Sequence, residues 1–141
     1  MYRDYSPILV QLSEDVDSGL VVTPSATPHD GKYPLVSASA MFSYARWMGI
    51  TLAAGYAGDI VAVAPPYSGL VMARIKCDIW AVRTGDAANI TSGGYFTTHE
   101  GSGEIFTGII MTPALNEAPE VGKVVKAMIF TGRFTYDRKS V

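Results

Sequence analysis

Three acidic side chains, Glu14, Asp15 and Asp17, come closest to a metal-binding pattern in this sequence. Several carboxylates in one short loop could hold a hard cation such as Ca²⁺. The segment lacks the glycine and the terminal glutamate that a calcium loop places at fixed offsets. We interpret it as a solvated turn, and we expect neither a metal site nor a cofactor.

Two histidines stand next to carboxylates, His29 before Asp30 and His99 before Glu100. A neighbouring carboxylate can orient an imidazole for general-base catalysis. Adjacent side chains on an extended chain point apart, however, and no serine has the Gly-x-Ser-x-Gly setting of a nucleophile. We therefore expect no catalytic residues. A β-barrel enzyme or ligand-binding module, with His99, Glu100 and Asp86 as its polar set, is the alternative from another class of function.

The glycine-rich stretches at 92–94 and 101–103 invite comparison with phosphate-binding loops. Neither is followed by the Lys-Ser or Lys-Thr pair of a P-loop, and no stretch matches the dinucleotide-binding fingerprint. These glycines are interpreted as turns between short strands, which are typical of a small barrel or sandwich.

The composition favours a structural or partner-bound protein over a nucleic-acid-binding one. Of the 141 residues, 48% are hydrophobic and only 17% are charged, below the roughly 25% charged share of an average soluble domain. That deficit indicates apolar surface covered by partners. The net charge of -2 without a basic cluster argues against nucleic acid. We expect no signal peptide and no membrane-spanning segment, and the single cysteine, Cys77, is expected to be a packed thiol. We therefore expect a soluble protein made in a reducing compartment.

An internal duplication is the strongest structural signal. The segments at about 46–71 and 105–134 each read as an apolar strand, a turn and a second strand, with glycines at matching places: Gly49 with Gly108, Gly58 with Gly122, and Gly69 with Gly132. The first two pairs are expected to be structural glycines, required for turns or close backbone approach. Between the copies, residues 70–82 alternate, with Met72, Arg74 and Lys76 on one face. The pattern predicts an all-β fold, either a small β-barrel of β-tulip type or a sandwich.

The first 34 residues differ from the rest, because residues 23–34 contain three prolines among small polar residues. We predict an extended N-terminal arm over residues 1–34 and a single β domain over residues 35–141. Deleting residues 1–12 would then leave the body folded. The candidate partner-binding residues are the aromatic and aliphatic side chains of this arm: Tyr2, Tyr5, Ile8, Leu9, Val10 and Leu12.

The duplicated unit combines Gly-Ile-x-(Leu/Met) with Gly-x-x-Val-x-(Val/Ala), and between the copies lie Thr84-Gly-Asp-Ala-Ala and Ser92-Gly-Gly-Tyr-Phe-Thr-Thr. Over residues of about 46–134 this pattern resembles the head decoration, or capsid cement, proteins of tailed bacteriophages. The resemblance implies a compact β domain, often trimeric, that sits on the outside of an icosahedral shell and clamps neighbouring subunits after head expansion.

On this resemblance we expect a structural virion protein, made in the host cytoplasm and located on the capsid exterior. Its partners would be the major capsid protein and itself, as a homotrimer, with no nucleic acid and no membrane. A tail-tube or neck subunit, which would form rings by strand addition, is the alternative within the same class.

Overall fold

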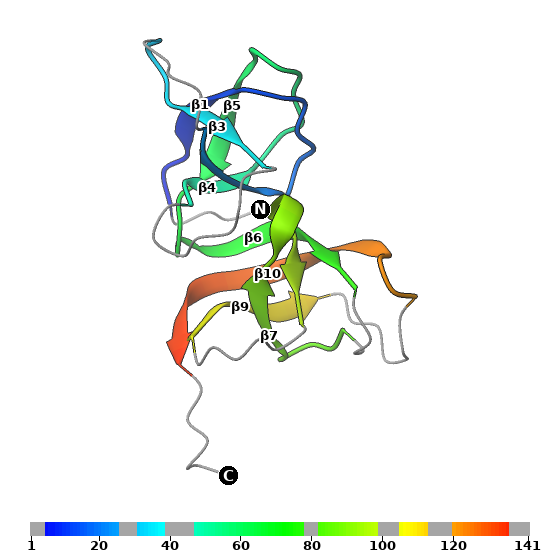
Figure 1. Ribbon diagram of the computed structural model, residues 1–141. Helices are drawn as coiled ribbons and strands as arrows, with labels where there is room; N and C mark the ends of the chain where they lie inside the picture. Colours follow the sequence, from blue (N-terminus) through cyan, green and yellow to red (C-terminus); the bar gives the residue numbers. More distant parts are fainter. Residues whose placement is uncertain are drawn as a thin grey trace.

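The computed structural model describes residues 5–25, 31–38, 47–77, 82–98, 105–112 and 120–135. These residues form strands and one short 3₁₀ turn (Figure 1), so the predicted all-β fold is confirmed. The elements are β1 (Ile8–Leu12), β2 (Val21–Pro24), β3 (Leu35–Ser37), β4 (Gly49–Thr51), β5 (Ile60–Ala64), β6 (Gly69–Lys76), β7 (Ala87–Ile90), η1 (Ser92–Gly94), β8 (Phe96–Thr97), β9 (Ile105–Thr112) and β10 (Val124–Thr135).

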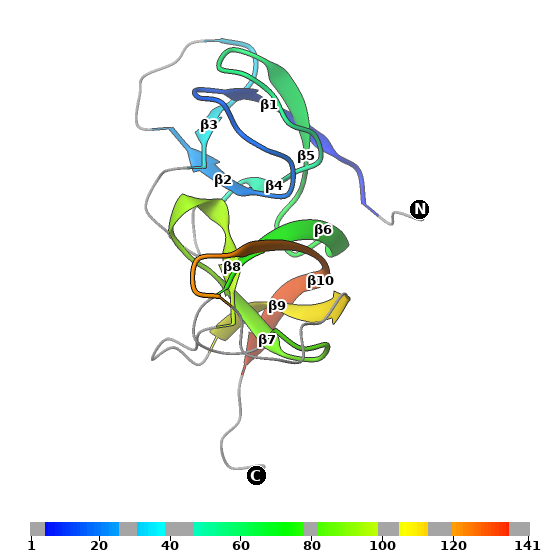
Figure 2. The ribbon, with the colours of Figure 1, turned by 90° about the vertical axis from the view of Figure 1, so that its right-hand side faces the viewer.

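The strands close into two barrels rather than one. The first has the order β1-β3-β2-β4-β5, and the second has the order β10-β6-β8-β7-β9. The second barrel follows the first along the chain, and the two are stacked in Figures 1 and 2. Closure matters because the described strands of each barrel then leave no open sheet edge for pairing with other chains.

Both barrels have the same topology. Read from its first strand, each follows the order first, third, second, fourth, fifth and back to the first. In each, the first strand pairs in parallel with the third and antiparallel with the fifth. The remaining pairings are antiparallel in both barrels. The chain is therefore a tandem repeat of a five-stranded barrel, and the two segments seen in the sequence are the last two strands of each copy.

Backbone hydrogen bonds show the repeat at the level of single residues. Leu12 N–H donates to the Asp59 carbonyl at 2.9 Å, and Gly58 N–H donates to the Leu12 carbonyl at 2.7 Å. In the second barrel, Cys77 donates to Lys123 at 2.8 Å and accepts from Gly122 at 2.9 Å. Gly58 and Gly122 both have positive φ, +92° and +88°. The predicted equivalence of these two turn glycines is thus visible in the fold.

The other two glycine pairs behave differently. Gly49 and Gly108 both allow close approach to the next strand, since a Cβ would lie 2.2 Å from the Ala64 carbonyl oxygen and 2.5 Å from the Ile129 side chain, respectively. Gly69 and Gly132 are not equivalent. Gly69 begins β6 opposite Thr131, whereas β10 continues through Gly132 for several residues more than β5 reaches. The third predicted pair is therefore wrong.

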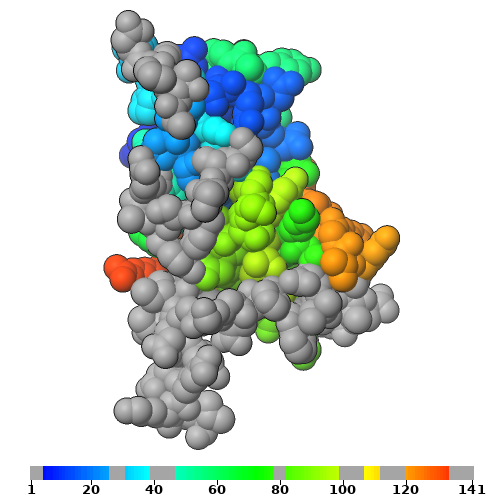
Figure 3. Space-filling view, in the orientation of Figure 1, coloured from blue at the N-terminus to red at the C-terminus, as the bar shows by residue number. Residues whose placement is uncertain are grey.

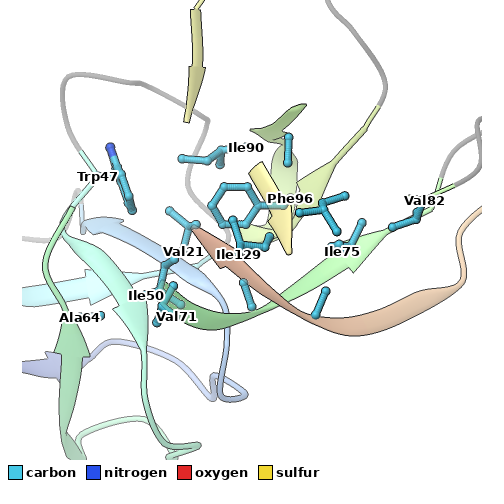
Figure 4. Packing of buried hydrophobic residues seen from close by; sticks show 14 of the residues in the cluster. Val21, Trp47, Ile50, Ala64, Val71, Ile75, Val82, Ile90, Phe96 and Ile129 are labelled. Carbon is cyan, nitrogen blue, oxygen red and sulfur yellow. The ribbon is translucent and has the colours of Figure 1, made fainter. Parts of the chain in front are cut away.

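The apolar cores follow from strand alternation. One cluster fills the first barrel and includes Val10, Leu12 and Val63. The other fills the second barrel and extends into the first, because Val21 and Ile50 face outward from the first barrel onto it (Figure 4). Gly94 of η1 allows the two barrels to approach closely, since a Cβ there would lie 2.5 Å from the Val21 carbonyl oxygen. The barrels thus share one continuous apolar cluster.

The predicted arm is corrected by this arrangement. Residues 8–12 and 21–24 are the first two strands of the first barrel, and Val10 and Leu12 are fully buried in its core. The predicted start of the body at residue 35 falls inside that barrel, while the break between barrels lies between β5 and β6. The prolines suggested an extended arm, but Pro24 ends β2 and Pro34 precedes β3. At such strand ends a missing N–H is tolerated.

Candidate partner-binding surface

The arm residues predicted to bind a partner differ in exposure along β1. Ile8 and Leu9 are 37% and 48% exposed, whereas Val10 and Leu12 are fully buried. Tyr5 is half-buried and packs against the shared apolar cluster. Val10 and Leu12 are therefore core residues, and only Ile8 and Leu9 remain available on this strand. Tyr2 lies outside the described residues.

A larger exposed surface lies on the outer face of β6 and β10. Alternation turns Val71, Ala73 and Ile75 into the second barrel. The outer face then carries three directly opposed cross-strand pairs: Leu70 with Phe130, Met72 with Met128, and Arg74 with Lys126. β10 continues this surface to β9, where Met111 is 42% exposed. We call this the β6–β10 face.

The β6–β10 face has an apolar part and a basic part. Leu70, Met72 and Phe130 are each more than 40% exposed, which is a large apolar area for neighbouring strand positions. Lys76 continues the basic part along β6, and its Nζ lies 5.7 Å from the centre of the Tyr95 ring. Figure 2 shows β5, β6 and β10 along the same side of the molecule. Ile60 of β5 is also exposed, at 43%, on the first barrel.

A cavity of about 120 Å³ lies where this face meets the first barrel. Its lining consists of Ser18, Gly19, Thr51, Leu52, Met72, Ala73, Arg74 and Lys126. Arg74 is fixed across the junction, because its backbone N–H donates to the Gly19 carbonyl at 2.9 Å and its Nε donates to the Ser18 carbonyl at 2.7 Å. Among these lining residues, two are cations and none is a carboxylate.

The acidic cluster singled out in the sequence supports loops of the first barrel. Glu14 Oε1 accepts hydrogen bonds from Ser37 Oγ at 2.8 Å and Ala38 N–H at 3.1 Å, and Asp15 Oδ1 accepts from Ala57 N–H at 2.9 Å. Asp15 and Asp17 line a second, open cavity of about 470 Å³. Among the described residues, no group of three or more His, Cys, Asp or Glu is arranged to hold a metal ion.

The polar set of the enzymatic alternative is only partly placed. Asp86 Oδ2 accepts a hydrogen bond from Arg83 N–H at 3.1 Å, as expected for a turn residue, while His99 and Glu100 lie outside the described residues. Cys77 is 3% exposed, and burial raises the pKa of its thiol while the nearby Lys123 acts in the opposite direction. A thiol with a raised pKa is a poor nucleophile at neutral pH.

The β6–β10 face was not among the binding sites predicted from the sequence, although the strand alternation indicated one of its two strands. The alternation of residues 70–82 already placed Met72, Arg74 and Lys76 on one face. What it lacked was the partner strand, because the long-range pairing of β6 with β10 brings Lys126 and Phe130 beside them.

Comparison with known proteins gives a likeness among solved structures. The chain matches no protein-family model, and no curated sequence matches it significantly. Among solved structures it is similar to the N base of head fiber gp8.5 of bacteriophage phi29, with a TM-score of 0.60 and 11% sequence identity. The match covers 94% of this chain and 98% of that one. At this identity the likeness shows the fold.

In the described part of the chain, no helix is long and apolar enough to cross a membrane.

Proposed function

We propose that the chain is a structural protein of a bacteriophage head, which attaches to the outer surface of the capsid and stabilises the expanded shell by bridging major capsid subunits. The observation that carries the proposal is the extent of the match to the phi29 head-fiber base. It includes 94% of this chain and 98% of that one, so it spans the tandem-barrel arrangement rather than a single barrel.

The surface chemistry agrees with attachment to a large protein assembly. Protein interfaces combine a desolvated apolar centre with a polar rim, and the β6–β10 face offers exposed Leu70, Met72 and Phe130 beside Arg74 and Lys126. On a symmetric shell many copies bind at once. Contacts that are weak individually then suffice for stable attachment, if several copies of the chain bind as one oligomer. We propose that this oligomer is a homotrimer, as the resemblance to decoration proteins implies.

Binding to heads is the direct test. Purified protein is mixed with expanded heads that lack it, and occupancy is measured by sedimentation and gel densitometry over a concentration series. Saturation at a fixed number of copies per head supports the proposal. Failure to bind heads, combined with binding to tails or necks, would favour the tail-tube or neck alternative. Light scattering of the free protein measures the oligomer, and a mass of one chain at all concentrations would reject the trimer.

A further inference from the structure

We infer that the cavity between Arg74 and Lys126 is a carboxylate-binding site, in which an acidic side chain of a partner protein docks with its apolar neighbours on Leu52 and Met72. The inference deepens the proposed function, on which it rests for the identity of the partner: a capsid segment that combines Asp or Glu with flanking apolar residues.

The charges around the cavity favour an anion. Arg74 and Lys126 occupy directly opposed positions of β6 and β10, and like charges at such positions destabilise a sheet. Lys76 and Lys123 lie near the same end of the strand pair. No carboxylate lines the cavity among the described residues. An incoming anion would therefore relieve repulsion that the isolated chain must tolerate, which favours binding of the charged partner over a neutral one.

The Arg74 side chain is preorganised for binding. The guanidinium of Arg74 is already oriented, because its Nε–H donates a hydrogen bond to the Ser18 carbonyl at 2.7 Å. Arginine carries five N–H donors, so this bond orients the group while its terminal nitrogens supply the donors that a carboxylate needs. Loss of rotamer freedom on binding is reduced for a side chain that is already fixed.

The apolar part of the lining favours a peptide partner over a nucleic acid. Met72 is 44% exposed and Leu52 is half-buried, and both line the cavity with the two cations. A nucleic acid would present phosphates in series and would leave this apolar lining, and exposed Leu70 and Phe130 beyond it, without contacts. A peptide segment in which a carboxylate is flanked by apolar side chains matches both parts of the surface.

The test uses the full chain and a peptide probe, N-acetyl-Leu-Glu-Leu-amide, with N-acetyl-Leu-Gln-Leu-amide as its uncharged control. Titration followed by NMR should shift the Arg74 Nε–H, the Met72 methyl and the Ser18 and Leu52 amides with the glutamate peptide only. Arg74→Gln and Lys126→Gln should each weaken binding about tenfold, because each removes a charge-assisted contact. Lys32→Gln, which removes an exposed cation of the first barrel, should leave it unchanged.

Lys126→Gln keeps the inference testable if Arg74→Gln perturbs the barrel junction. Equal shifts with both peptides, or no shift at tens of millimolar, would overturn the site. So would shifts that appear without peptide as the protein is concentrated and vanish in Lys126→Gln, because the occupant would then be a second copy of the chain.

Binding of the same variants to heads separates this inference from the proposed function. If the unmodified chain binds heads and Arg74→Gln and Lys126→Gln bind about tenfold more weakly, both stand. If all three bind equally, the carboxylate site is rejected and the head role survives. If the unmodified chain fails to bind heads while the glutamate peptide still occupies the cavity, the head role is rejected and the site survives.

Discussion

Substituting alanine for the repeated glycines tests the tandem-barrel fold in detail. Gly58 and Gly122 hold equivalent turns, with φ of +92° and +88°, and no atom lies within 4 Å of a Cβ built at either position. The cost of alanine there is the left-handed backbone alone, about 1–2 kcal/mol. We expect Gly58→Ala and Gly122→Ala to lower the free energy of unfolding by nearly the same amount, although they lie in different barrels.

Gly49→Ala should cost far more. Its φ is +140°, and a Cβ would lie 2.2 Å from the Ala64 carbonyl oxygen, which belongs to the neighbouring strand. Relief requires β4 to withdraw from β5 by about 1 Å, since carbon and oxygen pack at distances above 3 Å. That movement would break the pairing of Ile50 with Ala64. We expect a loss above about 4 kcal/mol, in the range that marks a severe steric or backbone conflict.

The assay is urea denaturation followed by far-ultraviolet circular dichroism, with the slope of the transition checked in each variant. The reasoning is refuted if Gly49→Ala costs no more than Gly58→Ala, because the close approach of β4 to β5 would then be absent. It is also refuted if Gly58→Ala and Gly122→Ala differ by more than their shared backbone geometry allows, about 1 kcal/mol.

Three further predictions follow from the cores. Leu12, fully buried, and Leu9, 48% exposed, share β1, so Leu12→Ala should cost about 2–5 kcal/mol and Leu9→Ala about 0.5 kcal/mol. Deletion of residues 1–12 removes β1, so it should abolish the cooperative unfolding transition, and an unchanged melting curve would contradict the place of β1 in the fold. Because Ile50 packs on the cluster that both barrels share, calorimetry should show one unfolding transition in the unmodified chain. Ile50→Asp should split this transition or lower its midpoint temperature. Two independent transitions in the unmodified chain would refute a shared core. Burial raises the pKa of the Cys77 thiol, so the folded protein keeps the thiol proton above the unfolded pKa of about 8.5. The free energy of unfolding should therefore fall as the pH rises above that value. Cys77→Ala should flatten this decline, and an identical pH profile would count against a buried thiol.

The sequence predicted the strand class and two of the three glycine equivalences, because those depend on local patterns. It detected the repeat only in the last two strands of each barrel. The first three strands of the two copies differ in length and residue type, since β1 has five residues and β6 has eight. Their equivalence rests on backbone hydrogen bonds, so that Leu12 and Cys77 occupy the same place with different side chains. Long-range pairing of this kind leaves little trace in residue type.

The same limitation explains the outcome for the candidate site. Val10 and Leu12 looked like an arm's apolar contacts, because no local signal shows that β1 pairs with β5 far along the chain. The cavity at the barrel junction needs Ser18, Arg74 and Lys126 together, from three segments that only the tertiary fold assembles. Each side chain taken alone is an ordinary polar surface residue.

Electron cryomicroscopy of heads incubated with the purified chain tests the central proposal most directly. We expect density for the two stacked barrels on the outer surface, contacting more than one capsid subunit. Heads without added density at saturating protein, or density confined to the tail or neck, would contradict it.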